Sequence, residues 1–236
     1  MLDPKGRKEV MEALQRLNQE QEMTVILITH DMEEAALASR IILLADGQVR
    51  FDGTPEDFFG ADALLARMGM EAPLSYRVRK IVECKERENT EKKTGHMTDV
   101  PKDQDLLSLQ HVSYIYSPGT AYEKVALDDV SLSLGKGEIV GLAGHTGSGK
   151  STMIQLLNGL LKPTRGTVTF EGKDIHAKGY SGNYLRSRVG MVFQYPEYQM
   201  ICDTVWEDVA FGPKRQGLSE AECQTRIQEA LAFVGL

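Results

Sequence analysis

A glycine-rich loop in the second half of the chain carries the residue types that bind phosphate groups. The pattern G-x-x-x-x-G-K-[ST] is met by Gly144, His145, Thr146, Gly147, Ser148, Gly149, Lys150 and Ser151. Its glycines permit backbone angles that turn successive N–H groups inward, and a helix that begins after the loop adds its positive end. Lys150 would neutralise the β- and γ-phosphates, and the Ser151 hydroxyl would ligate Mg²⁺. The loop therefore predicts a nucleotide site; the alternative is a glycine-rich turn without a ligand.

The surrounding sequence places this loop between a strand and a helix. Residues 138–143 form a short apolar run that ends at the loop, and a helix is predicted over residues 150–161. This strand–loop–helix order is the context in which the phosphate-binding pattern is specific. Further elements are predicted around it: strands over 106–116, 125–134, 167–170 and 189–193, and helices near 184–187 and over about 219–235.

The first part of the chain predicts α/β elements of its own. A helix over about 4–20 is followed by an apolar, β-branched run at Val25–Ile28, which is typical of a strand buried in a parallel sheet. Asp31 can cap a helix that extends through Ala38. Asp46-Gly47 then gives a hairpin turn signal between two short strands, and Thr54-Pro55 gives a helix start.

Composition favours a globular protein and disfavours several other classes. The 236 residues are 42% hydrophobic with a net charge of -7, whereas a general nucleic-acid binder carries a basic surplus. No apolar run approaches the ~18 residues that a membrane span needs, and the N-terminus lacks the apolar core of a secretory signal. Cys84, Cys202 and Cys223 form no Cys-x-x-Cys pair, which favours a reducing cytoplasm.

A charged stretch over residues 83–105 predicts a solvated linker, because it holds almost no large apolar residue. We therefore expect three segments: residues 1–82, the linker 83–105, and residues 106–236.

The segment 106–236 resembles the N-terminal part of the ATPase subunit of ATP-binding cassette (ABC) transporters. It is most similar to the second ATPase subunit of energy-coupling factor (ECF) transporters in the loop from Gly141 to Thr152, in Val192-Phe-Gln-Tyr-Pro-Glu197 and in Asp208-Val-Ala-Phe-Gly-Pro213. The resemblance implies that Tyr116 stacks on adenine, that Thr152 belongs to the nucleotide site, and that Gln194 contacts Mg²⁺ and the attacking water. The alternatives are a strand tyrosine that packs at the sheet edge and a solvated loop glutamine.

The segment 1–70 resembles a different part of the same family, the stretch that follows the Walker B carboxylates, and is more like the first ECF ATPase subunit. Leu2-Asp3-Pro4 looks like the D-loop, and Ile28-Thr-His-Asp31 looks like the switch-histidine motif. The resemblance implies that His30 contacts the γ-phosphate and that Asp3, His30 and Gln194 serve catalysis. A lone histidine is otherwise more often structural.

The resemblance implies an α/β P-loop NTPase fold of the ABC-cassette type, with a mostly parallel core sheet and an antiparallel β subdomain, incomplete in this chain. It implies ATP and Mg²⁺ as cofactors, and vitamins or metal ions as imported substrates. The implied partners are a transmembrane coupling protein and a second ATPase cassette, with no nucleic acid. The implied location is the cytoplasmic face of the cell membrane, as a peripheral subunit.

Two elements of the family are absent from these 236 residues: the signature Leu-Ser-Gly-Gly-Gln, and an apolar strand ending in Asp-Glu ahead of Leu2-Asp3. We therefore expect negligible ATP hydrolysis by this chain alone. The resemblance favours an ATPase component of an ECF importer. The competing hypothesis is a truncated module that binds ATP without turnover. An ABC ATPase of DNA repair or translation is disfavoured by the acidic charge.

The resemblance also predicts how the two segments meet. The strand ending at His30 would lie beside the strand entering the phosphate loop, and the closing hairpin would lie on that strand's other side. Left apart, these strands would expose apolar faces and unpaired backbone groups. We expect one composite, permuted α/β core. A further strand of the family would normally lie between residues 23–29 and 189–194, so a gap or an irregular pairing is expected there.

Overall fold

The computed structural model describes residues 4–79, 105–193 and 199–235. The helices are α1 (Pro4–Gln21), α2 (Met32–Ala35), α3 (Pro55–Gly60), α4 (Asp62–Arg67), α6 (Lys150–Leu157), α7 (Gly182–Arg188), α8 (Val205–Arg215) and α9 (Glu220–Phe233). The strands are β1 (Val25–Ile28), β2 (Arg40–Ala45), β3 (Gln48–Gly53), β4 (Leu107–Tyr116), β5 (Lys124–Leu134), β6 (Ile139–Ala143), β7 (Arg165–Phe170) and β8 (Lys173–Asp174). The predicted linker lies outside the described residues, apart from Asp105.

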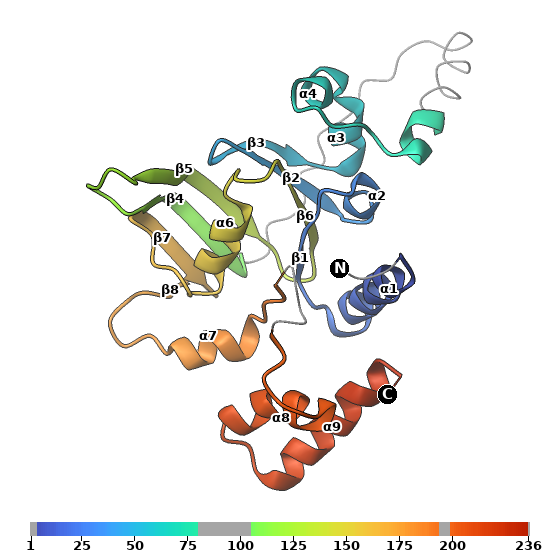
Figure 1. Cartoon of the computed structure of the whole chain (residues 1–236), viewed down its shortest axis with the longest axis vertical. Helices are drawn as coiled ribbons and strands as arrows, with labels where there is room; N and C mark the ends of the chain where they lie inside the picture. The colour runs from blue at the N-terminus through green and yellow to red at the C-terminus, as the bar shows by residue number, and fades with distance from the viewer. Residues whose placement is uncertain (1–3, 80–104, 194–198, 236) are drawn as a thin grey trace.

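The core sheet combines strands from both parts of the chain in the order β1-β6-β2-β3. β6 runs parallel to both neighbours, with Ile28 opposite Leu142 on one side and Leu43 opposite Ala143 on the other. Figure 1 shows β6 between β1 and β2, so a strand of the second part is inserted into the first part. The predicted composite core, with a mostly parallel sheet, is confirmed.

A second, antiparallel sheet has the order β5-β4-β7-β8, which confirms the predicted β subdomain. Helix α6 packs against both sheets: one buried cluster joins its Met153 and Leu156 to Leu142 of β6 and Leu127 of β5. The phosphate-loop helix therefore stands at the centre of the largest apolar core, where burial of aliphatic side chains is the main stabilising contribution.

The β2–β3 hairpin closes the core sheet as its sequence predicts. Asp46 and Gly47 have φ angles of 51° and 73°, the left-handed pair of a type I′ turn, and Ala45 pairs with Gln48 across it. Beyond the hairpin, Thr54 accepts a hydrogen bond from the Asp57 N–H at the start of α3. The phenylalanines of α3 then cover the outer face of β2, since Phe58 and Phe59 share a buried cluster with Ile41 and Leu43.

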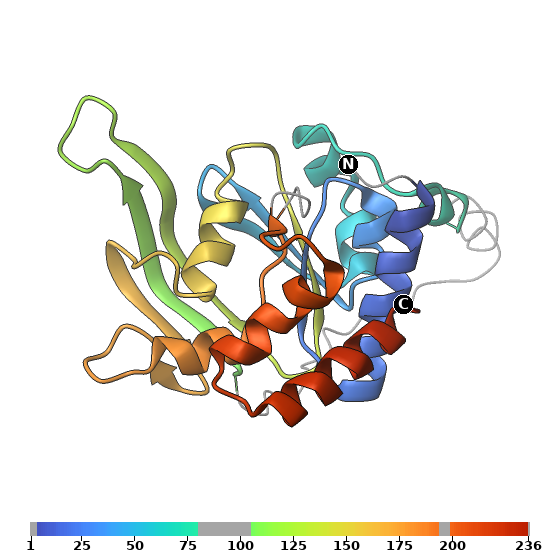
Figure 2. The same cartoon turned by 60° about the horizontal axis from the view of Figure 1, so that its bottom comes forward.

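The last two helices form a separate layer. Ala210 of α8 and Cys223 and Ile227 of α9 make a small buried cluster of their own. Figure 2 shows α9 running close to α1. The Arg16 guanidinium of α1 lies 4.4 Å from the ring centroid of Phe233 in α9, which is a further contact between the two parts of the chain.

Three predicted elements are shorter than expected or absent. The helix capped by Asp31 ends at Ala35 instead of Ala38, because the Ser39 N–H donates to the Ile139 carbonyl and draws the chain into the sheet. The helix at 150 ends at Leu157 instead of residue 161. Residues 190–193 are not a strand. Val189 is the C-cap of α7, and its carbonyl accepts a hydrogen bond from the Asn158 side-chain amide. β1 is the edge strand of the described core sheet, so no described strand lies beyond it to pair with residues 190–193. This is the gap that the composite core predicts.

None of the helices in the described ranges is both long and apolar enough to cross a membrane.

Candidate functional site

The phosphate loop leaves the carboxyl end of β6 and enters α6 within a few residues. Gly144 is buried and has a φ of 144°, while Gly147 and Gly149 have φ angles of 82° and 105°. Residues with a side chain rarely adopt these backbone angles, so these positions favour glycine. His145, Thr146 and Gly147 are exposed and Ser148 is buried, so the crest of the loop is open to a ligand.

The first turn of α6 has no side-chain cap. Gly149 occupies the N-cap position and makes no side-chain hydrogen bond to the helix. Helix N-termini carry N–H groups without intrahelical partners and a partial positive charge. This end of α6 therefore suits an anion, in agreement with the sequence pattern.

The Lys150 ammonium lies over its own loop. Its Nζ donates to the carbonyl oxygens of Gly144 at 2.6 Å and His145 at 2.7 Å, and to the Ser148 hydroxyl at 3.4 Å. Burial lowers the pKa of Lys150 from its ordinary value. None of these partners is a carboxylate, so phosphate oxygens would be stronger acceptors for this cation.

Tyr116, the predicted adenine platform, reaches the same helix. Its hydroxyl lies 3.2 Å from the hydroxyl of Thr152, which is buried in the first turn of α6. The Tyr114 ring packs edge-on against the Tyr116 ring, with 4.8 Å between the ring centroids. The structure thus brings Tyr116 and Thr152 together beside the phosphate loop.

His30 lies at the same edge of the sheet as the loop. Ile28 and Leu142 are opposite one another in neighbouring parallel strands, and His30 and Gly144 each follow two residues later. His30 is exposed, and the next residue, Asp31, accepts a hydrogen bond from the Glu33 N–H as the predicted cap of α2. The parallel register therefore directs both segments to one end of the sheet.

The remaining predicted site residues divide into two groups. Ser151 is exposed at the start of α6, where its hydroxyl is accessible to a cation held by phosphate oxygens. Asp3 and Gln194 lie outside the described residues, so their placement relative to the loop stays a prediction.

The donor set fits magnesium only as a partner of phosphate. In the described part of the chain, no three histidine, cysteine, aspartate or glutamate side chains gather into a metal site. A serine hydroxyl together with phosphate oxygens and water is an ordinary Mg²⁺ environment. Ser151 would hold the ion through its hydroxyl, and the nucleotide would supply the anionic oxygens.

The sequence patterns missed two residues that shape the loop, Leu44 and Gly47. A Cβ atom on Gly144 would lie 2.2 Å from the Leu44 carbonyl oxygen, and one on Gly149 would lie 3.2 Å from Leu44 Cδ2. The Gly47 N–H donates to the Ser148 carbonyl at 3.2 Å. The Asp46-Gly47 turn signal was visible in the sequence, but it predicts only a hairpin and not what the hairpin touches.

The phosphate loop lies in a part of the chain that matches known proteins in sequence. Residues 127–236 match the family model described as ABC transporter. The chain is 49% identical over 130 residues to the energy-coupling factor transporter ATP-binding protein EcfA2 of Clostridium acetobutylicum, covering 55% of this chain and 46% of that protein. It is 52% identical over 130 residues to EcfA2 of Caldanaerobacter subterraneus subsp. tengcongensis. The chain thus spans about half the length of these curated relatives.

A further relative matches the chain from end to end. This protein of Caldanaerobacter subterraneus subsp. tengcongensis is named as an ABC transporter ATP-binding protein, and it is 35% identical over 266 aligned positions, covering 100% of this chain and 45% of the relative. Among solved structures, CbiO1 of Clostridium perfringens, part of the ABC transporter complex CbiONQ, is 35% identical with a TM-score of 0.48, covering 55% of this chain and 50% of CbiO1.

Proposed function

We propose that the chain, whose residues 127–236 match the ABC transporter family and which is similar to energy-coupling factor ATP-binding proteins, binds MgATP as part of the ATPase component of an ECF importer. The imported substrates would be vitamins or metal ions. The observation that carries the proposal is the phosphate loop, which combines an exposed crest, an uncapped helix N-terminus and a lysine over loop carbonyls.

In the proposed site each residue has a separate task. Lys150 exchanges its loop carbonyls for phosphate oxygens, and the N–H groups at the start of α6 bind the β-phosphate. Tyr116 offers its ring face to the adenine, with its hydroxyl held beside Thr152. His30 approaches the γ-phosphate from the neighbouring strand end. Bound magnesium would neutralise phosphate charge, with Ser151 among its ligands.

The order of the two segments supports an origin in a longer fused ATPase. One relative aligns with the entire chain in a single stretch and extends beyond it, so the same order of segments occurs inside a longer ABC ATP-binding protein. We propose the segments 1–82 and 106–236 as the back of one cassette and the front of the next. The partners would be a membrane coupling protein and a second cassette, and the site of action would be the cytoplasmic membrane face.

The second candidate function is nucleotide binding without turnover by these 236 residues alone. In-line attack by water depends on positioned groups that stabilise charge in the transition state. The Leu-Ser-Gly-Gly-Gln signature and an Asp-Glu pair do not occur in this sequence, and residues 190–193 have no strand partner among the residues that the structure describes. We therefore propose that the isolated chain retains ADP and ATP binding but lacks measurable hydrolysis.

A titration with a fluorescent ATP analogue in the presence of Mg²⁺ tests the binding proposal. Saturable binding that unlabelled ATP displaces is expected, and Lys150→Ala should weaken it by at least about tenfold. Equal affinity in Lys150→Ala and the unchanged chain would refute the site. Phosphate release measured on the same samples separates the two candidates: turnover like that of an intact cassette, lost in His30→Ala, would exclude binding without hydrolysis.

A further inference from the structure

We propose that the Asp46-Gly47 turn is a positioning element of the phosphate loop, in which Gly47 fixes the orientation of the peptide between Ser148 and Gly149. The inference rests on the nucleotide site proposed above and extends that site to the hairpin from the other part of the chain. Gly47 itself would not touch the nucleotide.

The central contact is one backbone hydrogen bond. The Gly47 N–H donates to the Ser148 carbonyl oxygen at 3.2 Å. The described peptide bonds are trans, and in a trans peptide the carbonyl and the N–H point in opposite directions. Because the Ser148 carbonyl faces the turn, the Gly149 N–H faces away from it. A rotation of this peptide would withdraw that N–H from a phosphate bound at the start of α6.

The turn is itself held from the other side by β5. The Asp128 N–H donates to the Gly47 carbonyl at 2.9 Å, and the Gln48 side-chain amide donates to the Asp128 carboxylate at 2.9 Å. There is no room for a side chain at Gly47, because a Cβ atom there would lie 2.9 Å from the Ala126 carbonyl oxygen. Gly47 is therefore confined between β5 and the phosphate loop.

The strand that leads into the turn supports both ends of the loop. Leu44, which is fully buried, places its carbonyl against Gly144 and its side chain against Gly149. Leu44 thus leaves little or no space for a side chain at either glycine. A displacement of the turn would therefore reach the loop through Leu44 as well as through the Gly47 hydrogen bond.

The chain contains a matched control for this turn. Glu171 and Gly172 form the turn between β7 and β8 with φ angles of 50° and 73°, almost the same as the 51° and 73° of Asp46 and Gly47. A Cβ atom on Gly172 would meet nothing within 4 Å. Alanine thus introduces the same backbone strain at both positions, and only at Gly47 does it also press against β5 beside the loop.

The experiment compares the unchanged chain with Gly47→Ala and Gly172→Ala. Two measurements are made: the Kd for a fluorescent ATP analogue with Mg²⁺, and amide hydrogen exchange of the peptide that covers residues 144–151 without nucleotide. For Gly47→Ala we expect about fivefold weaker nucleotide binding and about threefold faster exchange of the loop. Gly172→Ala should match the unchanged chain in both measurements.

Loop exchange and affinity that are unaltered in folded Gly47→Ala, or altered equally in Gly172→Ala, would overturn the proposal. If the unchanged chain binds no nucleotide, the proposed function fails, while the exchange comparison still decides the role of the turn. If Gly47→Ala does not fold, Gln48→Ala takes its place, because it removes only the side-chain hydrogen bond to Asp128. Faster loop exchange in Gln48→Ala supports the proposal, and exchange equal to that of the unchanged chain contradicts it.

Discussion

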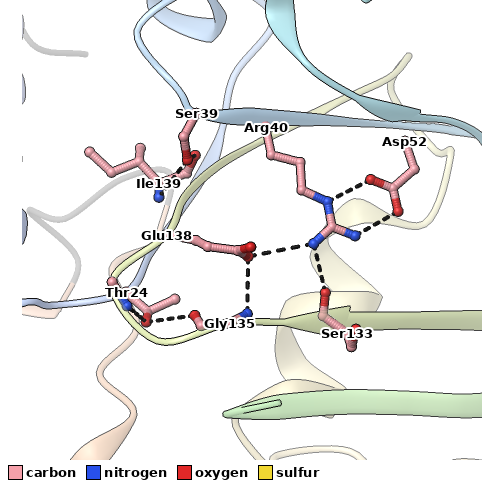
Figure 3. A network of polar contacts seen from close by, with 9 residues as sticks. Thr24, Ser39, Arg40, Asp52, Ser133, Gly135, Glu138 and Ile139 are labelled. Carbon is pink, nitrogen blue, oxygen red and sulfur yellow. Dashed lines mark hydrogen bonds and ion pairs between the residues drawn. The ribbon is translucent and has the colours of Figure 1, made fainter. Parts of the chain in front are cut away.

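The two ends of β6 are held in different ways. At the start of β6, Arg40 of the neighbouring strand β2 makes two hydrogen bonds to Asp52, at 2.6 and 2.7 Å (Figure 3). Arg40 also donates to the Ser133 carbonyl at 2.9 Å. After its last residue, the phosphate loop is held by backbone hydrogen bonds and close glycine contacts, and its crest is exposed.

This difference separates stability from binding. The start of β6 joins the two parts of the chain through charged side chains that are partly buried, with Glu138 and Ser39 extending the network across the same joint. The end of β6 keeps its polar groups accessible for a ligand. Substitutions at the start should lower the free energy of unfolding, and substitutions at the end should lower nucleotide affinity.

The largest expected effect on stability is at Arg40. Hydrogen bonds to Asp52 raise the pKa of Arg40, so it stays charged throughout the working pH range. Arg40→Ala leaves Asp52 and Glu138 without their shared cation, and we expect a loss of about 2 kcal/mol in the free energy of unfolding, or about 4–8 °C in Tm. Denaturant unfolding without nucleotide measures this loss.

The control for Arg40 is Arg77→Ala. Arg77 lies 3.4 Å from Glu71 in a pair whose side chains are 58% and 86% exposed, so its removal should change stability by less than about 0.5 kcal/mol. Equal losses in the two variants would mean that the joint at the start of β6 contributes no more than a surface ion pair.

Lys150→Ala should show the reverse pattern. Burial lowers the pKa of this lysine, which means that its charged form is poorly solvated, and its partners are uncharged groups of its own loop. We expect the free energy of unfolding to change by less than about 1 kcal/mol without nucleotide, although nucleotide binding weakens by at least about tenfold. A decrease as large as that of Arg40→Ala would remove the distinction between the two ends.

The smallest expected effect is at Tyr116. Tyr116→Phe removes the hydroxyl that contacts Thr152 but keeps the ring, so we expect about twofold to threefold weaker ATP binding. Binding of inorganic triphosphate, which has no adenine, should not change. Tyr122→Phe is the control, because Tyr122 is 86% exposed. Equal changes for ATP and triphosphate would show that Tyr116 does not orient the base.

Features set by local sequence were predictable. The phosphate loop, α1, the β2–β3 hairpin and the strands β4 to β6 follow from glycine positions, caps and apolar patterns over a few residues. Helix α8 was not predicted, because Gly212 and Pro213 discourage a helix, although Thr204 followed by Glu207 is a helix-start signal and Thr204 does cap the helix. Pro213 lies inside this helix and removes one of its i→i−4 hydrogen bonds.

Features that depend on distant partners were predictable only in part. The family resemblance correctly predicts β6 between β1 and β2, since both neighbours are present in this chain. The apolar run 189–193 looks like a strand but lacks a described neighbour to pair with, and a strand is not stable without one. The contact between Gly47 and Ser148 joins residues far apart in sequence, so no local pattern could indicate it.

The composite core is tested most directly by proton NOE measurements on the intact chain, labelled at backbone amides and at isoleucine, leucine and valine methyl groups. The account predicts cross-strand NOEs between Val25 and Ile139 and between Ile42 and Leu142, which belong to opposite sides of the linker. These NOEs should persist on dilution and be absent between differently labelled chains. The composite core would be contradicted if the NOEs between β2 and β3 were present but no NOE joined β1 or β2 to β6.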